Sequence, residues 1–222
     1  MIQIITISIL LAVFNYCYVQ YYHNAKKGVL NGAERFIMPF TFKRSLLFFV
    51  MLILMLGLAI YIEQLNTEES IWFVTKRICC LGLLFPSAVI DFRDHKIPNK
   101  LLFIYICLRI VVLLFEGLMG NGHFMATFLD ETISVIFVLG ITLLCRLIVK
   151  NGICMGDIKM MALMAMFLGS QSLINALFVS LWICFFEAIG LMVWKKKSKK
   201  DAIAFAPSVL MGTIISVILT GY

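Results

Sequence analysis

Two aspartates lie at the borders of long apolar runs, one directly after a glycine and the other seven residues before a proline. Asp157 belongs to the segment NGICMGDIK (residues 151–159), and Asp91 opens the segment DFRDHKIPN (residues 91–99). Placing a carboxylate close to hydrocarbon costs free energy, so such a residue is by default a candidate for a functional site. Two carboxylates that share one proton can activate water and donate a proton to a scissile carbonyl, which is the chemistry of aspartyl proteolysis. We therefore take Asp91 and Asp157 as the candidate catalytic pair.

The composition is that of a membrane protein. Of the 222 residues, 62% are hydrophobic and 14% are charged, and the mean hydropathy is +1.01. A soluble domain of this size could not cover so many apolar side chains with polar surface. The apolar runs are continuous rather than alternating, which disfavours a β-barrel. The sequence therefore predicts an all-α fold, a polytopic helical membrane protein.

Several runs approach the roughly 20 residues that cross a bilayer core. A break at Gly169-Ser170-Gln171-Ser172 divides the longest apolar stretch in two. We predict about eight transmembrane helices, with the N-terminus outside, in one membrane-embedded peptidase domain over residues 1–222. Residues 1–70 would form two N-terminal helices with a short basic loop, and residues 71–222 the catalytic helix core. The expected helices are Ile2–Tyr21, Ser45–Ile62, Ile71–Ile90, Leu101–Leu118, Thr132–Val149, Ile158–Leu168, Leu173–Trp194 and Ala202–Leu219.

The net charge of +7 is explained by membrane topology rather than by nucleic-acid binding. When alternate loops are assigned to opposite sides, 16 of the 19 Lys and Arg residues fall on one side. The positive-inside rule makes that side cytoplasmic. We expect the protein in the cytoplasmic membrane, with Asp91 and Asp157 facing the cytoplasm. Lys76 and Arg77 interrupt the third run, and we expect an interfacial segment with a shortened span, a kink, or a snorkelling pair.

The two motifs together resemble a known family. Gly156-Asp157-Ile158-Lys159 after Gly152, and Asp91 six residues before Ile97-Pro98-Asn99, resemble the type IV prepilin peptidases and their archaeal preflagellin relatives, which are GxGD intramembrane aspartyl proteases. The tail AFAPSVLMG (residues 204–212) is similar to the proline-containing final helix of that family. The resemblance implies that Asp91 and Asp157 are catalytic, and that the supporting motif positions are Gly152, Gly156, Lys159, Pro98 and Asn99.

The resemblance also implies which substrates and which cofactors to expect. The substrates would be prepilins or pseudopilins, whose short basic leader is cleaved from an apolar helix at the cytoplasmic face. Proteolysis needs no cofactor, and S-adenosylmethionine would be needed only for a methyltransferase activity. Many relatives carry a tetracysteine zinc segment in the first cytoplasmic loop, but residues 23–44 contain no cysteine. We expect no metal. Cys154 stands at the first glycine of GxGD, so local flexibility would depend on Gly152 and Gly156.

Two other functions fit paired acids in a membrane. A proton- or cation-coupled transporter would place its acids near the bilayer midplane in helices broken in matching halves. A non-catalytic pilus-assembly scaffold would tolerate Asp91→Asn or Asp157→Asn. The sequence leaves the oligomeric state open.

The helix dipoles at the two motifs suggest how the pair would share its proton. Asp91 ends one expected helix, where a carboxylate is disfavoured, and Asp157 opens another, where it is favoured. These ends predict Asp157 as the ionised acid and Asp91 as the protonated one. Separately, Glu187 lies inside an apolar run, and we expect it to make a structural hydrogen bond.

Overall fold

Every regular element that the structure describes is an α-helix. The computed structural model describes residues 2–26, 42–65, 71–119, 124–148, 153–193 and 204–220. Within these ranges six helices are long and apolar enough to cross a membrane, and α7 is a shorter apolar helix. The protein is a polytopic helical membrane protein, as predicted. The helices are α1 (Ile2–Lys26), α2 (Phe42–Leu65), α3 (Ile71–Asp94), α4 (Asn99–Leu118), α5 (Phe124–Ile148), α6 (Met155–Val193) and α7 (Phe205–Thr220).

Helix α3 is the centre of the bundle. In its most apolar stretch 89% of the residues are buried, against 33% or less in the other five candidate spans. It packs against α1, α2, α4, α6 and α7. Gly82 gives it close contact on one face, where the Tyr105 hydroxyl of α4 donates to Asn15 Oδ1 of α1 at 2.7 Å. A residue near the end of α3 is therefore held on several sides.

Helix α6 reverses direction at Gly169, the break that the sequence predicts. Gly169 has φ +72°, and a Cβ there would lie 2.6 Å from Asp130 Oδ2. Asp130 of α5 accepts hydrogen bonds from the Ser170 amide at 2.9 Å and from its hydroxyl at 2.5 Å. It thereby satisfies free N–H groups where the second half of α6 begins. Because residues 155–193 still form one element, the count of eight helices remains a prediction.

The sequence prediction placed Asp130 and Glu131 in a loop, and this was wrong. Helix α5 begins at Phe124, eight residues before the expected Thr132, so both acids lie inside it. Hydropathy marked the helix start too late because it treats an acid as the end of an apolar run. In the structure Asp130 accepts hydrogen bonds from Ser170 and Glu131 pairs with Lys76 and Arg109, so both acids have partners on other helices and the helix continues through them.

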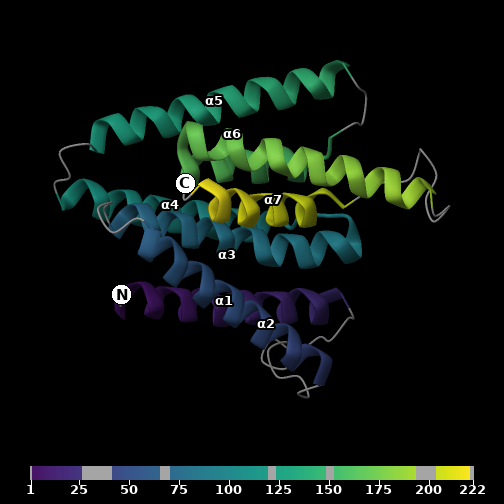
Figure 1. Ribbon diagram of the computed structural model, residues 1–222, viewed down its shortest axis with the longest axis horizontal. Helices are drawn as coiled ribbons and strands as arrows, with labels where there is room; N and C mark the ends of the chain where they lie inside the picture. Colours follow the sequence, from purple (N-terminus) through teal and green to yellow (C-terminus); the bar gives the residue numbers. More distant parts are fainter. Residues whose placement is uncertain are drawn as a thin grey trace.

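The helix ends gather at two ends of the bundle (Figure 1). The end of α3 and the starts of α4, α6 and α7 meet at one end through the contacts described below. The end of α5 joins them, because Arg146 Nη1 donates to the Ile153 carbonyl at 3.3 Å. At the opposite end, the Tyr61 hydroxyl of α2 donates to the Ile218 carbonyl of α7 at 2.9 Å. This alternation agrees with the predicted order of crossings.

Lys76 belongs to a buried ion-pair network, so the expectation that Lys76 and Arg77 snorkel is wrong. Its Nζ lies 3.2 Å from Glu116 and 2.8 Å from Glu131. Arg109 of α4 pairs with the same two glutamates and donates to the Met166 carbonyl at 2.8 Å. All four side chains are at most 8% exposed. Arg77, also buried, donates to Ser172 Oγ at 2.9 Å. Helix α3 therefore continues through this pair, because charged partners on α4 and α5 neutralise Lys76.

Candidate active site

Asp91 lies in the last turn of α3 and faces the start of α7. Its side chain is buried, at 5% exposure, and Oδ2 accepts a hydrogen bond from the Ala206 amide at 3.0 Å. Just beyond Asp91, His95 has φ +49°, and its amide donates to the Asp91 carbonyl at 2.9 Å. This left-handed residue ends the helix in the manner of an αL cap. The carboxyl is thus fixed at the end of the central helix.

Asp157 lies in the first turn of α6 and interacts electrostatically with Asp91. Its amide donates to the Cys154 carbonyl at 3.1 Å, which closes the first turn of the helix. Its side chain is half-buried, whereas that of Asp91 is buried. The structure therefore brings together two carboxyls that are 66 positions apart in the chain, at one end of the bundle.

Gly156 allows the two motifs to approach each other. A Cβ on Gly156 would lie 3.1 Å from Ile97 Cβ, closer than ordinary van der Waals contact. Glycine at this position permits both positive φ and the close approach of another backbone. The structure shows the close approach, whereas Gly156 itself lies within the first turn of α6 and Gly169 is the described glycine with positive φ. Its small size admits the chain that follows Asp91.

Lys159 and Asn99 contact each other, which gives both motif positions a structural role. Lys159 Nζ donates to Asn99 Oδ1 at 3.1 Å. Pro98 precedes α4 with φ −72°, and its carbonyl accepts the Leu101 amide at 3.1 Å. These contacts connect the start of α4 to the first turns of α6. Gly152, the remaining motif position, lies outside the described residues.

Cys154 reports on the electrostatics of this end of the bundle. Desolvation raises the pKa of its thiol, and the Asp157 and Asp91 carboxyls raise it further, while Arg146 acts in the opposite direction. Both aspartates therefore act on the loop that leads into α6. The residue at the first glycine position of GxGD is a thiol beside two acids.

The start of α7 is a part of the site to which the sequence analysis assigned no role. The Ser208 hydroxyl donates to Glu187 Oε2 of α6 at 2.8 Å, the structural hydrogen bond expected of Glu187. Further along, a Cβ on Gly212 would lie 2.6 Å from Ser180 Cα, so the two helices touch at their backbones. Pro207 was the available signal, because proline in a first helical turn marks a helix N-terminus with free N–H groups.

Contact with α7 bears on the expected sharing of the proton, which remains a prediction. The expectation considered only α3 and α6, which carry the two aspartates. A helix N-terminus favours an anionic partner, and the structure aims that of α7 at Asp91 through Ala206. The hydrogen bond from Ala206 therefore adds a contact that favours an anionic oxygen at Asp91 and that the expectation left out.

A comparison with protein families adds an independent finding. A model of the type IV leader peptidase family matches residues 78–191, slightly more than half of the chain, and this range includes both aspartates. The chain belongs to the type IV leader peptidase family. Membership agrees with the resemblance to prepilin peptidases and makes the protein a multi-pass membrane protease of that family. Comparisons with curated proteins and with solved structures found no match.

The described part of this leader peptidase family member holds no group of three His, Cys, Asp or Glu side chains that could bind a metal ion. The expectation of a metal-free enzyme remains a prediction, because residues 27–41 and other segments lie outside the described ranges. The two aspartates need no such group for the chemistry considered below.

Proposed function

We propose that the protein is an intramembrane aspartyl endopeptidase that removes basic leaders from prepilin-like membrane proteins at the cytoplasmic face of the cell membrane. The observation that carries the proposal is the pairing of Asp91 and Asp157 at one end of the bundle, in a chain of the leader peptidase family. The membrane face follows from the basic loops and the positive-inside rule.

Asp91 is the general base in this proposal. The Ala206 amide at the start of α7 stabilises its carboxylate. Two neighbouring carboxylates do not both ionise readily, so Asp157 keeps the proton of the pair. Asp91 takes a proton from water, the oxygen attacks the scissile carbonyl carbon, and Asp157 donates its proton to the carbonyl oxygen. As this intermediate collapses, one of its hydroxyls returns a proton to Asp157, the C–N bond breaks, and the amine leaves with the proton that Asp91 held.

The substrates would be prepilins or pseudopilins with a short basic leader before an apolar helix. Water is the only co-reactant of the proposed proteolysis. S-adenosylmethionine would serve only a separate methylation of the new amino terminus, and the proposal does not include that step.

The experiment compares wild type with Asp91→Asn and Asp157→Asn. Each is purified in detergent and incubated with a prepilin-like substrate, and cleavage is followed by gel shift and mass spectrometry. We expect each variant to lose at least about 10²-fold in rate, because each removes a general acid or base. Glu63→Gln makes the same change in the last turn of α2, at the opposite end of the bundle, and should cleave normally.

Other outcomes would favour the alternatives. Unimpaired cleavage by either Asn variant would overturn the roles of the pair. A wild type that cleaves none of several prepilins would favour a transporter or a scaffold. For a transporter, the buried Glu116 and Glu131 are poor carriers because each is paired with Lys76 and Arg109.

A further inference from the structure

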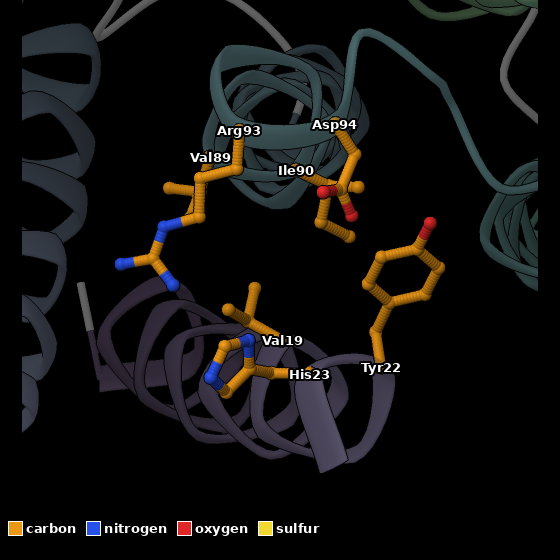
Figure 2. A pocket seen from close by; sticks show the side chains of 7 residues that line it. All are labelled: Val19, Tyr22, His23, Val89, Ile90, Arg93 and Asp94. Carbon is orange, nitrogen blue, oxygen red and sulfur yellow. The ribbon is translucent and has the colours of Figure 1, made fainter. Parts of the chain in front are cut away.

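A cavity lies on a different face of α3 from Asp91. It has a volume of about 340 Å³ and opens between α1 and α3 at the end of the bundle that holds Asp91 (Figure 2). Asp91 turns toward α7, whereas the cavity faces α1. The cavity is lined by Val19, Tyr22, His23, Val89, Ile90, Arg93 and Asp94.

The polar groups of this cavity are separated by charge. In Figure 2, Arg93 and His23 lie on one side of the space, and Asp94 and Tyr22 lie on the other. Tyr22, His23 and Asp94 each also interact within the protein, so their positions are held without a ligand. A ligand that fills the space meets a guanidinium at one edge and a carboxylate at the other.

The cavity lies where a membrane protein meets lipid headgroups. Its residues come from the last turns of α1 and α3, both long enough to cross the bilayer core. Tyrosine and basic side chains at such helix ends are typical of the membrane interface. Val19, Val89 and Ile90 give the cavity an apolar part that suits the glycerol and first methylene groups of a lipid.

We propose that this cavity binds the headgroup of a zwitterionic phospholipid carrying a phosphate and a primary ammonium group. The phosphate would accept hydrogen bonds from the Arg93 guanidinium, which suits phosphate geometry. The ammonium would donate to the Asp94 carboxylate and to the Tyr22 hydroxyl oxygen. A purely anionic headgroup would place its negative charge beside the Asp94 carboxylate, and a basic peptide would place its cations beside the Arg93 guanidinium. A quaternary ammonium has no N–H to donate.

The test measures lipid retention by the full-length protein. Protein purified in detergent is delipidated and incubated with phosphatidylethanolamine, phosphatidylglycerol or phosphatidylcholine of the same acyl chains, and bound lipid is counted by native mass spectrometry. We expect phosphatidylethanolamine to be retained about tenfold better than the other two, the effect of one charge-assisted hydrogen bond. Equal retention of all three would overturn the proposal.

Variants locate the lipid on the protein. Arg93→Gln should lower retention of phosphatidylethanolamine by about tenfold, and Asp94→Asn should abolish its preference over phosphatidylglycerol. Lys96→Gln, an exposed cation that does not line the cavity, should change neither. Unchanged retention in both cavity variants would overturn the site, and a thermal melt of each variant confirms that it is folded.

Two competitors distinguish the lipid from other ligands. Soluble phosphoethanolamine carries the same charges without acyl chains, and its displacement of the lipid at equal concentration would assign the cavity to a free zwitterion instead. Displacement by a basic leader peptide would assign it to the substrate. Retention against both competitors supports the lipid.

Discussion

The two aspartates differ in what surrounds them, although their residue type is the same. Asp91 is buried at the end of the central helix and accepts the amide of Ala206, and Asp157 is half-buried in the first turn of α6. Gly156 matters because a side chain there would press on Ile97. At the level of single residues the site depends on one hydrogen bond and one missing Cβ.

Cys154 provides a probe of the charge on the aspartate pair. In a variant with Cys154 as its sole cysteine, alkylation should be slow at neutral pH, because a raised thiol pKa leaves little thiolate. Changing both Asp91 and Asp157 to Asn should lower the pKa of the Cys154 thiol and speed alkylation. Below the pKa, the rate should rise about tenfold for each unit by which the pKa falls. The measurement is the alkylation rate between pH 6 and about 10.

Single variants sharpen this prediction. Either Asn change alone leaves one carboxyl free to ionise, so its effect should be smaller than that of the double change. Glu63→Gln, at the far end of the bundle, should leave the rate unaltered. If the double variant were alkylated as slowly as the parent, the carboxyls would not lie close to Cys154.

Helix α7 is the element that positions Asp91. It packs against α3 and α6, and its first two turns donate Ala206 N–H to Asp91 and the Ser208 hydroxyl to Glu187. The close backbone contact of Gly212 with Ser180 fixes the position of α7 along the axis of α6. Because this sixteen-residue helix contacts both neighbours, its placement on α6 determines where its first turn meets Asp91 of α3.

Loss of the Ser208–Glu187 hydrogen bond should impair cleavage without removing a catalytic group. We expect Ser208→Ala to lower kcat by about tenfold with little change in KM, because the start of α7 shifts relative to Asp91. Glu187→Gln keeps an acceptor for Ser208 and should cleave near the wild-type rate, whereas Glu187→Leu should match Ser208→Ala. The measurement is steady-state cleavage of a prepilin-like substrate.

A control on the same helix separates positioning from general damage. The Thr213 hydroxyl donates to Val209 of its own helix at 2.8 Å, so Thr213→Val should leave kcat unchanged. A Ser208→Ala enzyme with normal kcat would exclude the positioning role of this hydrogen bond.

In the whole molecule, the site and the ion-pair network occupy opposite ends of α3. The network joins α3, α4 and α5 through Lys76, Arg109, Glu116 and Glu131, and its charges balance. Apart from it and the contact of Asp130 with Ser170, α5 is held mainly by packing on α6. Figure 1 shows α5 at the edge of the bundle. The network therefore attaches a peripheral helix to the central one.

Removal of one charge from the network should destabilise the whole fold. Glu131→Gln leaves Lys76 and Arg109 with a single carboxylate, and an uncompensated buried charge costs about 3–5 kcal/mol. The measurement is the free energy of unfolding in mixed micelles with increasing sodium dodecyl sulfate.

A charge-balanced variant serves as the control for the network. Lys76→Met combined with Glu116→Gln removes one cation and one anion and keeps the pair of Arg109 and Glu131, so it should lose less stability than Glu131→Gln alone. An equal or greater loss would show that charge balance is not what matters there.

Much of this architecture could be predicted from the sequence, because the membrane imposes strong local rules. Long apolar runs become helices since backbone groups need partners within the segment, and the basic loops alternate. The break at Gly169 was visible as a polar interruption between two apolar runs. The two aspartate motifs were identifiable because carboxylates are rare beside such runs.

Contacts between distant segments could be decided only by the tertiary structure. Periodicity along one helix carries no information on which other helix end faces it, so the contact of α7 with Asp91 could not be predicted. The same holds for Lys76, whose partners lie 40 and 55 positions away. The sequence shows that the charge of Lys76 is unusual within an apolar run, but only the packing of the helices shows that it is neutralised within the bundle.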